Sequence, residues 1–241
     1  MKRSLNIALA WLVGMWVHTA MAQTSSLTAI CSTDQSWCEM AANEFQKATG
    51  IRVLQTRKPT GEALAQLRAE AANPKTDLWW GGTGDPQLQA AEEGLTEPYV
   101  SPSLPKLRPW AREQAERSGH RAVGIYMGAL GFGYNTDEVK SRKLTPPACW
   151  ADLIKPEFKG EVQMADPNSS GTAYTAMATL VQLMGEEPAF AYLKKLHANI
   201  NEYTKAGAAP AQAAGLGETV IGIAFQPLLY YFIARREDEK K

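Results

Sequence analysis

The chain has 241 residues, and its 25 Lys and Arg residues balance 25 Asp and Glu residues, so the formal net charge is zero. This balance argues against nucleic acid as a partner, because binding to phosphate backbones requires clustered positive charge. Without a leader, roughly 220 residues remain, which suffice for one large domain or two small ones around a real core.

The N-terminus has the pattern of a secretory signal. Two basic residues follow Met1, an apolar run extends from 5 to 17, and small residues occupy positions 20 and 22. We therefore predict a signal peptide over 1–22, cleaved after Ala22. The alternative is an uncleaved anchor, although the run is short for a membrane span and contains Gly14 and His18. No later stretch is apolar for long enough to cross a bilayer, so we expect the mature part to be soluble and to lie outside the cytoplasm.

Three cysteines are present, and two of them, Cys31 and Cys38, lie close together. In an oxidising compartment this spacing suggests a small disulfide loop, because a metal site would need further Cys or His nearby and there is none. The loop would mainly hold residues 32–37 in place. Cys149 is then either buried and free, or paired with a partner outside this chain.

The first half of the chain alternates strands and helices. We predict strands over 27–31, 51–55 and 78–80. A capping box of Ser36 and Glu39 predicts the start of the first helix, and Gly50 its end. The second helix is bounded by Thr60 and by residues 73–74, and the third is expected to begin with Asp85 as its cap.

A glycine-rich segment divides this half from the next. Residues 122–135 are β-like but contain four glycines, which predicts a crossover between two bodies. Beyond it the pattern restarts, with helices over 150–154, 172–184 and 187–198 and strands over 162–164, 200–203 and 220–225. We expect an α/β fold with largely parallel sheets, helices on both faces, and ligands at the carboxyl ends of the strands.

Four predicted strand-to-helix junctions are rich in small and hydroxylated residues: 32–36, 81–85, 168–172 and 204–209. Each offers backbone N–H groups, hydroxyls and a helix N-terminus, which together can surround an oxyanion without a fixed cation. Taken singly, each junction could be an ordinary helix cap. Their joint placement at strand ends favours a shared anion site.

Catalytic residues are sparse by comparison. Beyond the leader only His120 and His197 remain, and neither has a neighbouring nucleophile in a recognisable arrangement. His197, on an apolar helix face, is interpreted as structural. The sequence has no nucleophile elbow, no phosphate-binding loop and no zinc-binding helix motif. Trp79, Trp80 and Tyr126 could line a sugar-type cleft or belong to the core.

The chain resembles periplasmic binding proteins of the ferric-iron, phosphonate and hexose-phosphate importer group. The resemblance rests on CSTDQSWC at 31–38, WWGGTGDP at 79–86, GALGFGYN at 128–135 and DPNSSGTAYT at 166–175. It continues through YTKAGAAP at 203–210 and GETVIGI at 217–223. The paired cysteines and the WGGT loop are most similar to the sugar-phosphate binders of the group.

The resemblance implies a two-lobed, hinged fold that closes over an anionic solute and delivers it to a membrane permease of an ATP-driven importer. It implies lobe 1 over 23–127, lobe 2 over 128–225 with the crossover near 122–135, and an atypical tail over 226–241. The protein would be a monomer without a cofactor and without catalytic activity. The implied cleft residues are Ser32, Thr33, Gly82, Thr83, Ser169, Ser170, Gly171, Thr172 and Gly207.

The sequence departs from the family's pattern after Phe225. Tyr230 and Tyr231 look like the tyrosine pair of the iron binders but are displaced, so ferric iron is kept as an alternative ligand. A periplasmic enzyme acting on phosphate esters is a further alternative. We interpret the tail as that of a truncated product whose first lobe is incomplete, and expect it to be less stable than a full-length relative because apolar faces lose their cover.

Overall fold

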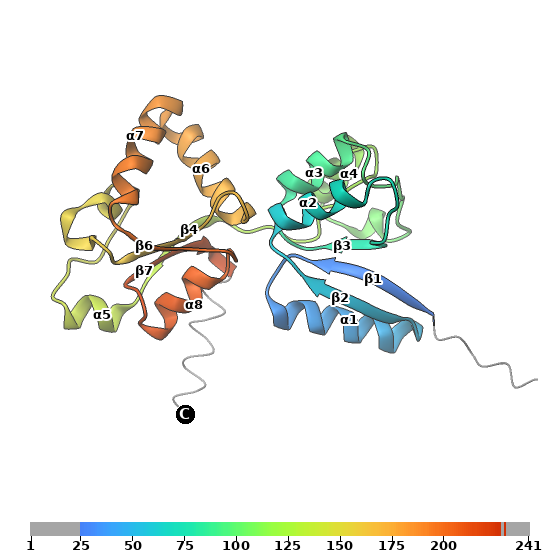
Figure 1. Ribbon diagram of the computed structural model, residues 1–241, viewed down its shortest axis with the longest axis horizontal. Helices are drawn as coiled ribbons and strands as arrows, with labels where there is room; N and C mark the ends of the chain where they lie inside the picture. The colour runs from blue at the N-terminus through green and yellow to red at the C-terminus, as the bar shows by residue number, and fades with distance from the viewer. Residues whose placement is uncertain (1–24, 228, 230–241) are drawn as a thin grey trace, which may run out of the picture.

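The computed structural model describes residues 25–227 and residue 229, and it contains two parallel-rich sheets flanked by helices. The sheets belong to two lobes that lie side by side (Figure 1). The predicted α/β, two-lobed architecture is confirmed. The proposed signal peptide and the residues Tyr230 and Tyr231 lie outside the described residues.

The first lobe is built on a three-stranded parallel sheet of order β2-β1-β3. Its strands are β1 (Ser26–Cys31), β2 (Arg52–Arg57) and β3 (Leu78–Trp80). Helix α1 covers one face and helices α2 to α4 lie on the other (Figure 1). These helices are α1 (Gln35–Thr49), α2 (Thr60–Glu70), α3 (Gly84–Glu92) and α4 (Pro109–Arg117), with a short 3-10 turn η1 (Leu104–Lys106) before α4.

The second lobe is built on a four-stranded sheet of order β4-β7-β5-β6, parallel except where β4 meets β7. Its strands are β4 (Leu130–Tyr134), β5 (Val162–Ala165), β6 (Ile200–Thr204) and β7 (Ile221–Phe225). Its helices are α5 (Thr136–Ser141), α6 (Gly171–Met184), α7 (Glu186–His197) and α8 (Ala209–Leu216), with 3-10 turns η2 (Trp150–Ile154) and η3 (Pro156–Phe158).

The main hydrophobic core lies in the second lobe, between its sheet and the helices on both faces. Helices α6 and α7 cover one face, and α5 and α8 cover the other (Figure 1). Every residue of β5 is buried, which is typical of a parallel strand covered on both sides. Leu153, Phe158 and Leu180 are fully enclosed around it.

The predicted starts of α1 and α3 were wrong by two residues. The cap of α1 is Asp34, whose carboxylate accepts the N–H of Ser36 at 3.0 Å, so the capping box of Ser36 and Glu39 was wrong. Asp34 precedes Ser36 and its carboxylate is the stronger acceptor for the first turn. Helix α3 begins at Gly84 after Thr83, not after Asp85. The end of α1 at Gly50, in left-handed conformation, agrees with the prediction.

The β-like segment 122–135 forms a strand only in its last part, as β4. Residues 122–129 have no strand assignment and pair with no strand of the two described sheets. Within this part Ile125 and Met127 are exposed. The glycine density therefore marks an extended connection followed by a short strand.

Cys31 and Cys38 form a disulfide, as predicted from their spacing. Both side chains are buried, so the bond joins the end of β1 to the first turns of α1 inside the lobe. Cys149 is exposed and forms no disulfide within the described residues, so the prediction that it is buried and free was wrong, whereas a partner outside this chain stays a prediction. Among the described helices, none is long and apolar enough to span a bilayer.

We expect replacement of both Cys31 and Cys38 by Ala to lower the free energy of unfolding by about 2 kcal/mol, because the unfolded chain regains the entropy of a short loop. Urea denaturation under non-reducing conditions measures this change. Cys149→Ser is the matched control and should leave the midpoint unchanged, because that thiol forms no disulfide and a hydroxyl can keep its hydrogen bond to Oδ2 of Asp152. Equal midpoints for the double variant and the control would contradict a stabilising role of the bond.

Candidate functional site

A cavity of about 330 Å³ lies between the two lobes, at the carboxyl ends of their strands. This volume falls within the range of small-molecule sites. Four junctions that follow β1, β3, β5 and β6 all reach it, as the fold of such sheets predicts. Eight of the nine cleft residues implied by the sequence line it: Ser32, Thr33, Gly82, Thr83, Ser170, Gly171, Thr172 and Gly207.

Ser169 is the exception, because it does not line the cavity. Its hydroxyl donates to the backbone oxygen of Lys205 at 3.1 Å, and its own backbone oxygen accepts the N–H of Gly61 at 2.9 Å. Ser169 thus connects the turn before α6 to the loop after β6 and to the start of α2, and the cavity is lined by Ser170 instead.

The N-terminus of α6 presents unpaired donors to the cavity. The helix has no side-chain cap, and its first helical hydrogen bond is the one that the N–H of Tyr174 donates to Ser170. Among the described residues, the N–H groups of Thr172 and Ala173 have no hydrogen-bond partner. Two unpaired N–H groups at the positive end of a helix are well suited to an anion.

Hydroxyl and indole donors add to these N–H groups. Within the described part of the chain, the side-chain oxygens of Thr33, Ser170 and Thr172 have no hydrogen-bond partner, although all three residues line the cavity. Oγ1 of Thr83 and Nε1 of Trp110 are buried and also unpartnered in this part of the chain. Buried polar atoms are normally satisfied, so this cluster points to a polar guest or ordered water.

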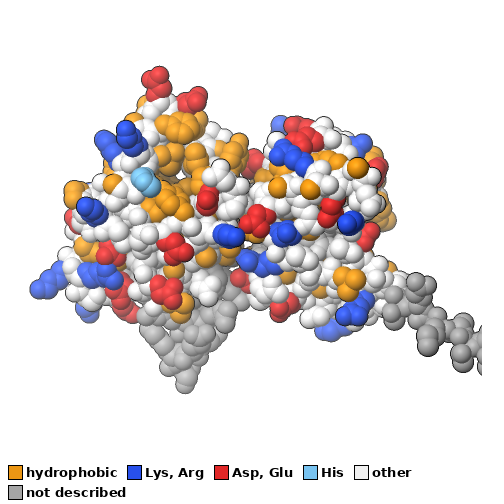
Figure 2. Space-filling view, in the orientation of Figure 1, with side chains coloured by type: hydrophobic (Ala, Val, Ile, Leu, Met, Phe, Trp, Pro, Cys, Tyr) orange, Lys and Arg blue, Asp and Glu red, His pale blue; other side chains and the backbone are white. Residues whose placement is uncertain are grey.

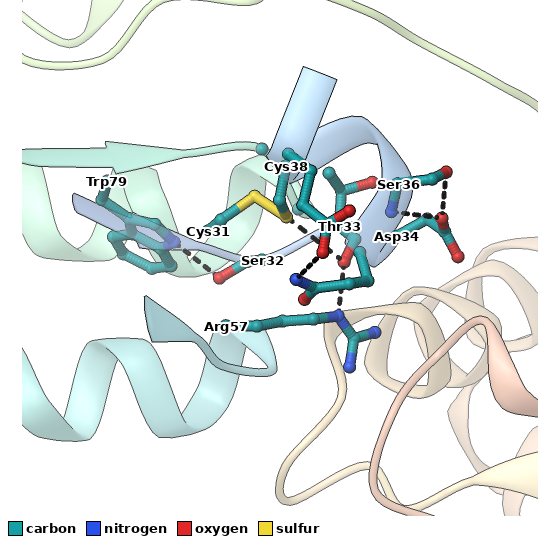
Figure 3. The surroundings of a disulfide bond; sticks show 12 residues. Cys31, Ser32, Thr33, Asp34, Ser36, Cys38, Arg57 and Trp79 are labelled. Atoms are coloured by element: carbon teal, nitrogen blue, oxygen red, sulfur yellow. Dashed lines mark hydrogen bonds between the residues drawn. A yellow bond between two sulfur atoms is a disulfide. The ribbon is translucent and has the colours of Figure 1, made fainter. Parts of the chain in front are cut away.

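The cavity also contains fixed charges, which corrects the expectation of an oxyanion site without a cation. Arg57 and Lys58, at the end of β2, are part of the lining. Nε of Arg57 donates to the backbone oxygen of Thr33 at 2.8 Å, which leaves the terminal nitrogens of the guanidinium on the cavity side (Figure 3). The predicted site did not include the end of β2, which lies at the same edge of its sheet as the ends of β1 and β3.

Acidic side chains accompany these cations. Asp34 and Asp85 line the same cavity, and Figure 2 shows basic and acidic side chains side by side along the boundary of the lobes. One carboxylate oxygen of Asp34 is committed to Ser36 at the start of α1 (Figure 3). The site can therefore accept hydrogen bonds as well as donate them.

Aromatic side chains form an apolar wall in the cavity. Trp37, Trp110 and Tyr126 line it, and the rings of Trp37 and Tyr126 meet edge to face with centroids 5.9 Å apart. The hydroxyl of Tyr126 accepts the N–H of Gly82 at 2.7 Å, which ties the wall to the loop after β3. Of the three predicted aromatic residues, only Tyr126 faces the cavity.

Trp79 and Trp80 do not line the cavity. Nε1 of Trp79 donates to Oγ of Ser32 at 2.8 Å and so supports the loop after β1 (Figure 3). Trp37 and Trp110 were missed as wall residues, because a tryptophan on a helix gives no signal of which body it faces, and the helix α4 that carries Trp110 was not predicted. The side that each tryptophan faces depends on how the helices pack in the folded protein.

The two histidines in the described residues, His120 and His197, do not line the cavity. His197 lies at the exposed end of α7, where its ring stacks on Tyr203 and its Nδ1 is 2.9 Å from the Tyr203 hydroxyl. It is therefore a surface pair and not part of an apolar face. In residues 25–227 and 229, no group of three or more His, Cys, Asp and Glu side chains could hold a metal ion.

Comparison with known proteins assigns the chain to a family. The family of bacterial extracellular solute-binding proteins matches residues 73–232. The chain belongs to this family. An uncharacterized protein of Haemophilus influenzae is 43% identical over 226 residues, which cover 93% of this chain and 65% of the relative. The chain thus spans less than two thirds of that relative's length.

Two further relatives carry information on ligands. The periplasmic binding protein AfuA of Actinobacillus pleuropneumoniae, solved with exogenous fructose 6-phosphate bound, superposes with a TM-score of 0.84. It is 43% identical, and the match covers 88% of this chain and 66% of AfuA. A putative 2-aminoethylphosphonate-binding periplasmic protein of Salmonella paratyphi A is 30% identical over 72% of this chain and 48% of the relative.

Gly82 tests how tightly the loop after β3 is packed against the site. It has a φ of +90°, and a Cβ there would overlap Thr60 and lie 2.9 Å from Cβ of Ser32. We expect Gly82→Ala to destabilise the protein by about 1 kcal/mol for the left-handed backbone plus at least about 1 kcal/mol for overpacking.

Gly94→Ala is the matched control for this experiment. Gly94 also has a positive φ, of +70°, but a Cβ there would meet nothing within 4 Å. Gly94→Ala should therefore lose only the stability that a left-handed backbone costs an alanine. The difference between the two variants in the free energy of unfolding, measured by chemical denaturation, then gives the contribution of packing in the loop. Equal losses would mean that the loop after β3 is not packed as described.

Proposed function

We propose that this protein is the periplasmic substrate-binding component of an ATP-driven importer, and that it captures an anionic solute of the sugar-phosphate or phosphonate type. It would act as a monomer, close two lobes over the solute and present it to a membrane permease, without chemical change to the solute. The proposal includes a cleaved leader over 1–22, lobes over 23–127 and 128–225, and a crossover near 122–135.

One observation carries this proposal: unpaired donors from both lobes and the guanidinium of Arg57 converge on a single cavity. A phosphate or phosphonate group offers several acceptor oxygens and negative charge, which match the N–H groups of α6 and the hydroxyls of Thr33, Thr83, Ser170 and Thr172. We assign ligand contact to these residues together with Ser32, Gly82, Gly171 and Gly207.

The remaining lining suggests what is attached to the anionic group. The aromatic wall gives an apolar surface for a carbon skeleton. Asp34 and Asp85 can accept hydrogen bonds from sugar hydroxyls or from an ammonium group. A small polar molecule with one anionic end, such as a hexose phosphate or an aminoalkylphosphonate, therefore fits better than a bare inorganic anion.

A thermal-shift screen tests this proposal, with fructose 6-phosphate, 2-aminoethylphosphonate, inorganic phosphate and ferric citrate as probes. A ligand at 100 times its dissociation constant should stabilise the fold by about 2.7 kcal/mol, which gives a clear shift of the melting temperature. Stabilisation by ferric citrate alone, with the visible colour of tyrosine-bound iron, would favour the iron alternative. Absence of any shift with the phosphorus compounds would contradict the proposal.

Arg57 should contribute strongly to affinity for such an anion. Loss of a charge-assisted hydrogen bond in Arg57→Gln should weaken binding of the stabilising phosphorus compound by about tenfold or more, measured by titration calorimetry. Arg52→Gln is the matched control, because Arg52 begins the same strand β2 but lies outside the cavity lining. Comparable losses in both variants would point to long-range charge effects and not to contact by Arg57.

A further inference from the structure

The two lobes touch beside the cavity, where the start of α2 meets the turn before α6. The N–H of Gly61 donates to the backbone oxygen of Ser169 at 2.9 Å, and Oγ1 of Thr60 accepts the N–H of Gly171 at 2.8 Å. Thr60 and Gly171 are both buried. Because the bond between Thr60 and Gly171 is shielded from bulk water, it is electrostatically stronger than an exposed one.

The approach of the lobes at this point requires residues without side chains. A Cβ at Gly61 would lie 2.6 Å from the backbone oxygen of Asn168 and 2.9 Å from that of Ser169. A Cβ at Gly171 would overlap the hydroxyls of Thr60 and Thr83. The first two obstacles are backbone atoms, which cannot move aside without separating the lobes.

This contact also satisfies one of the backbone N–H groups at the N-terminus of α6. Thr60, from the first lobe, satisfies the N–H of Gly171, whereas the N–H groups of Thr172 and Ala173 remain unpaired among the described residues. The helix end of the second lobe is thus fixed by a hydroxyl of the first, with its next two donors directed to a guest. Separation of the lobes would leave the N–H of Gly171 without this partner.

We propose that Thr60 and Gly61 are positioning residues that latch the lobes in the binding-competent arrangement before a ligand enters. The latch goes beyond the proposed function, because its two hydrogen bonds involve no ligand atom. The apparent affinity of a closing protein is its intrinsic affinity multiplied by the fraction of molecules in the competent state. The latch raises that fraction, and its loss lowers affinity for any ligand of the site.

The first experiment measures closure without a ligand. Spin labels on Cys149, in the second lobe, and on a thiol introduced by Asn43→Cys, on exposed α1 in the first lobe, report the distance between lobes. The protein with an intact latch should show one narrow distance distribution. Gly61→Ala in this background should shift or broaden it, because the added methyl group meets the backbone oxygens of the other lobe.

The melting temperature of Gly61→Ala distinguishes loss of the latch from general destabilisation of the fold. Alanine is a better helix former than glycine, and Gly61 lies within α2, so the melting temperature should stay equal or rise while the lobes separate. The matched control is Gly131→Ala on β4, where a Cβ would meet nothing within 4 Å. This control should keep the narrow distribution. An unchanged distribution in Gly61→Ala would overturn the proposal.

The second experiment tests the hydroxyl of Thr60, with fructose 6-phosphate as the probe. Thr60→Val keeps the shape of the side chain and removes the acceptor oxygen. It should widen the distribution of distances between the lobes without ligand and weaken binding about tenfold. Thr60→Ser, which keeps the hydroxyl, should restore the narrow distribution and the affinity. Tighter binding by Thr60→Val would overturn the latch, because it would show that the hydroxyl competes with the ligand. A widened distribution in a protein that binds no phosphorus compound would support the latch while the proposed function fails.

Discussion

The backbone N–H groups at the start of α6 impose the constraint around which the rest of the site is arranged. A helix leaves its first N–H groups without internal partners, and here no side chain of the same turn caps them. They can be satisfied only by water, by a guest, or by the opposite lobe. The structure uses the opposite lobe for one of them, through Thr60, and leaves the next two open to the cavity.

Arg57 extends this arrangement from the first lobe. Its guanidinium is held by the backbone oxygen of Thr33, in a loop bracketed by the disulfide and supported from behind by Trp79. The cation and the helix end therefore belong to different lobes, and neither is complete as an anion site alone. A guest can contact the cation and the helix end together only when the lobes meet, which is the arrangement that the proposed latch maintains before the guest enters.

Much of this organisation could be predicted from the sequence because it follows from local rules. Alternating strands and helices predicted parallel sheets, and parallel sheets gather their strand-to-helix junctions at one edge. The sequence therefore predicted that Ser32, Thr83, Ser170 and Gly207 lie close together, and all four line the cavity. The cysteine spacing predicted the disulfide in the same way. Such features depend on residues that are close in sequence or fixed by topology.

The features that escaped prediction depend on how two distant surfaces meet. Arg57 ends a largely exposed strand and Thr60 begins a helix, and neither position gives a sign that another lobe lies opposite. Trp110 lies on α4, a helix that the periodicity did not reveal, and Ser169 differs from Ser170 only in which way the turn directs it. These outcomes are set by packing between lobes, which no local pattern contains.

The antiparallel pairing of β4 with β7 has a mechanical consequence. Leu130, where the chain enters the second sheet, lies opposite Phe225, where it leaves, and the N–H of Gln226 donates to the oxygen of Ala129 at 2.8 Å. The strand that enters the second sheet is therefore held directly by the last described strand of that sheet. A movement that pulled the crossover away from the second lobe would have to break this ladder, so the crossover enters that lobe at a fixed place.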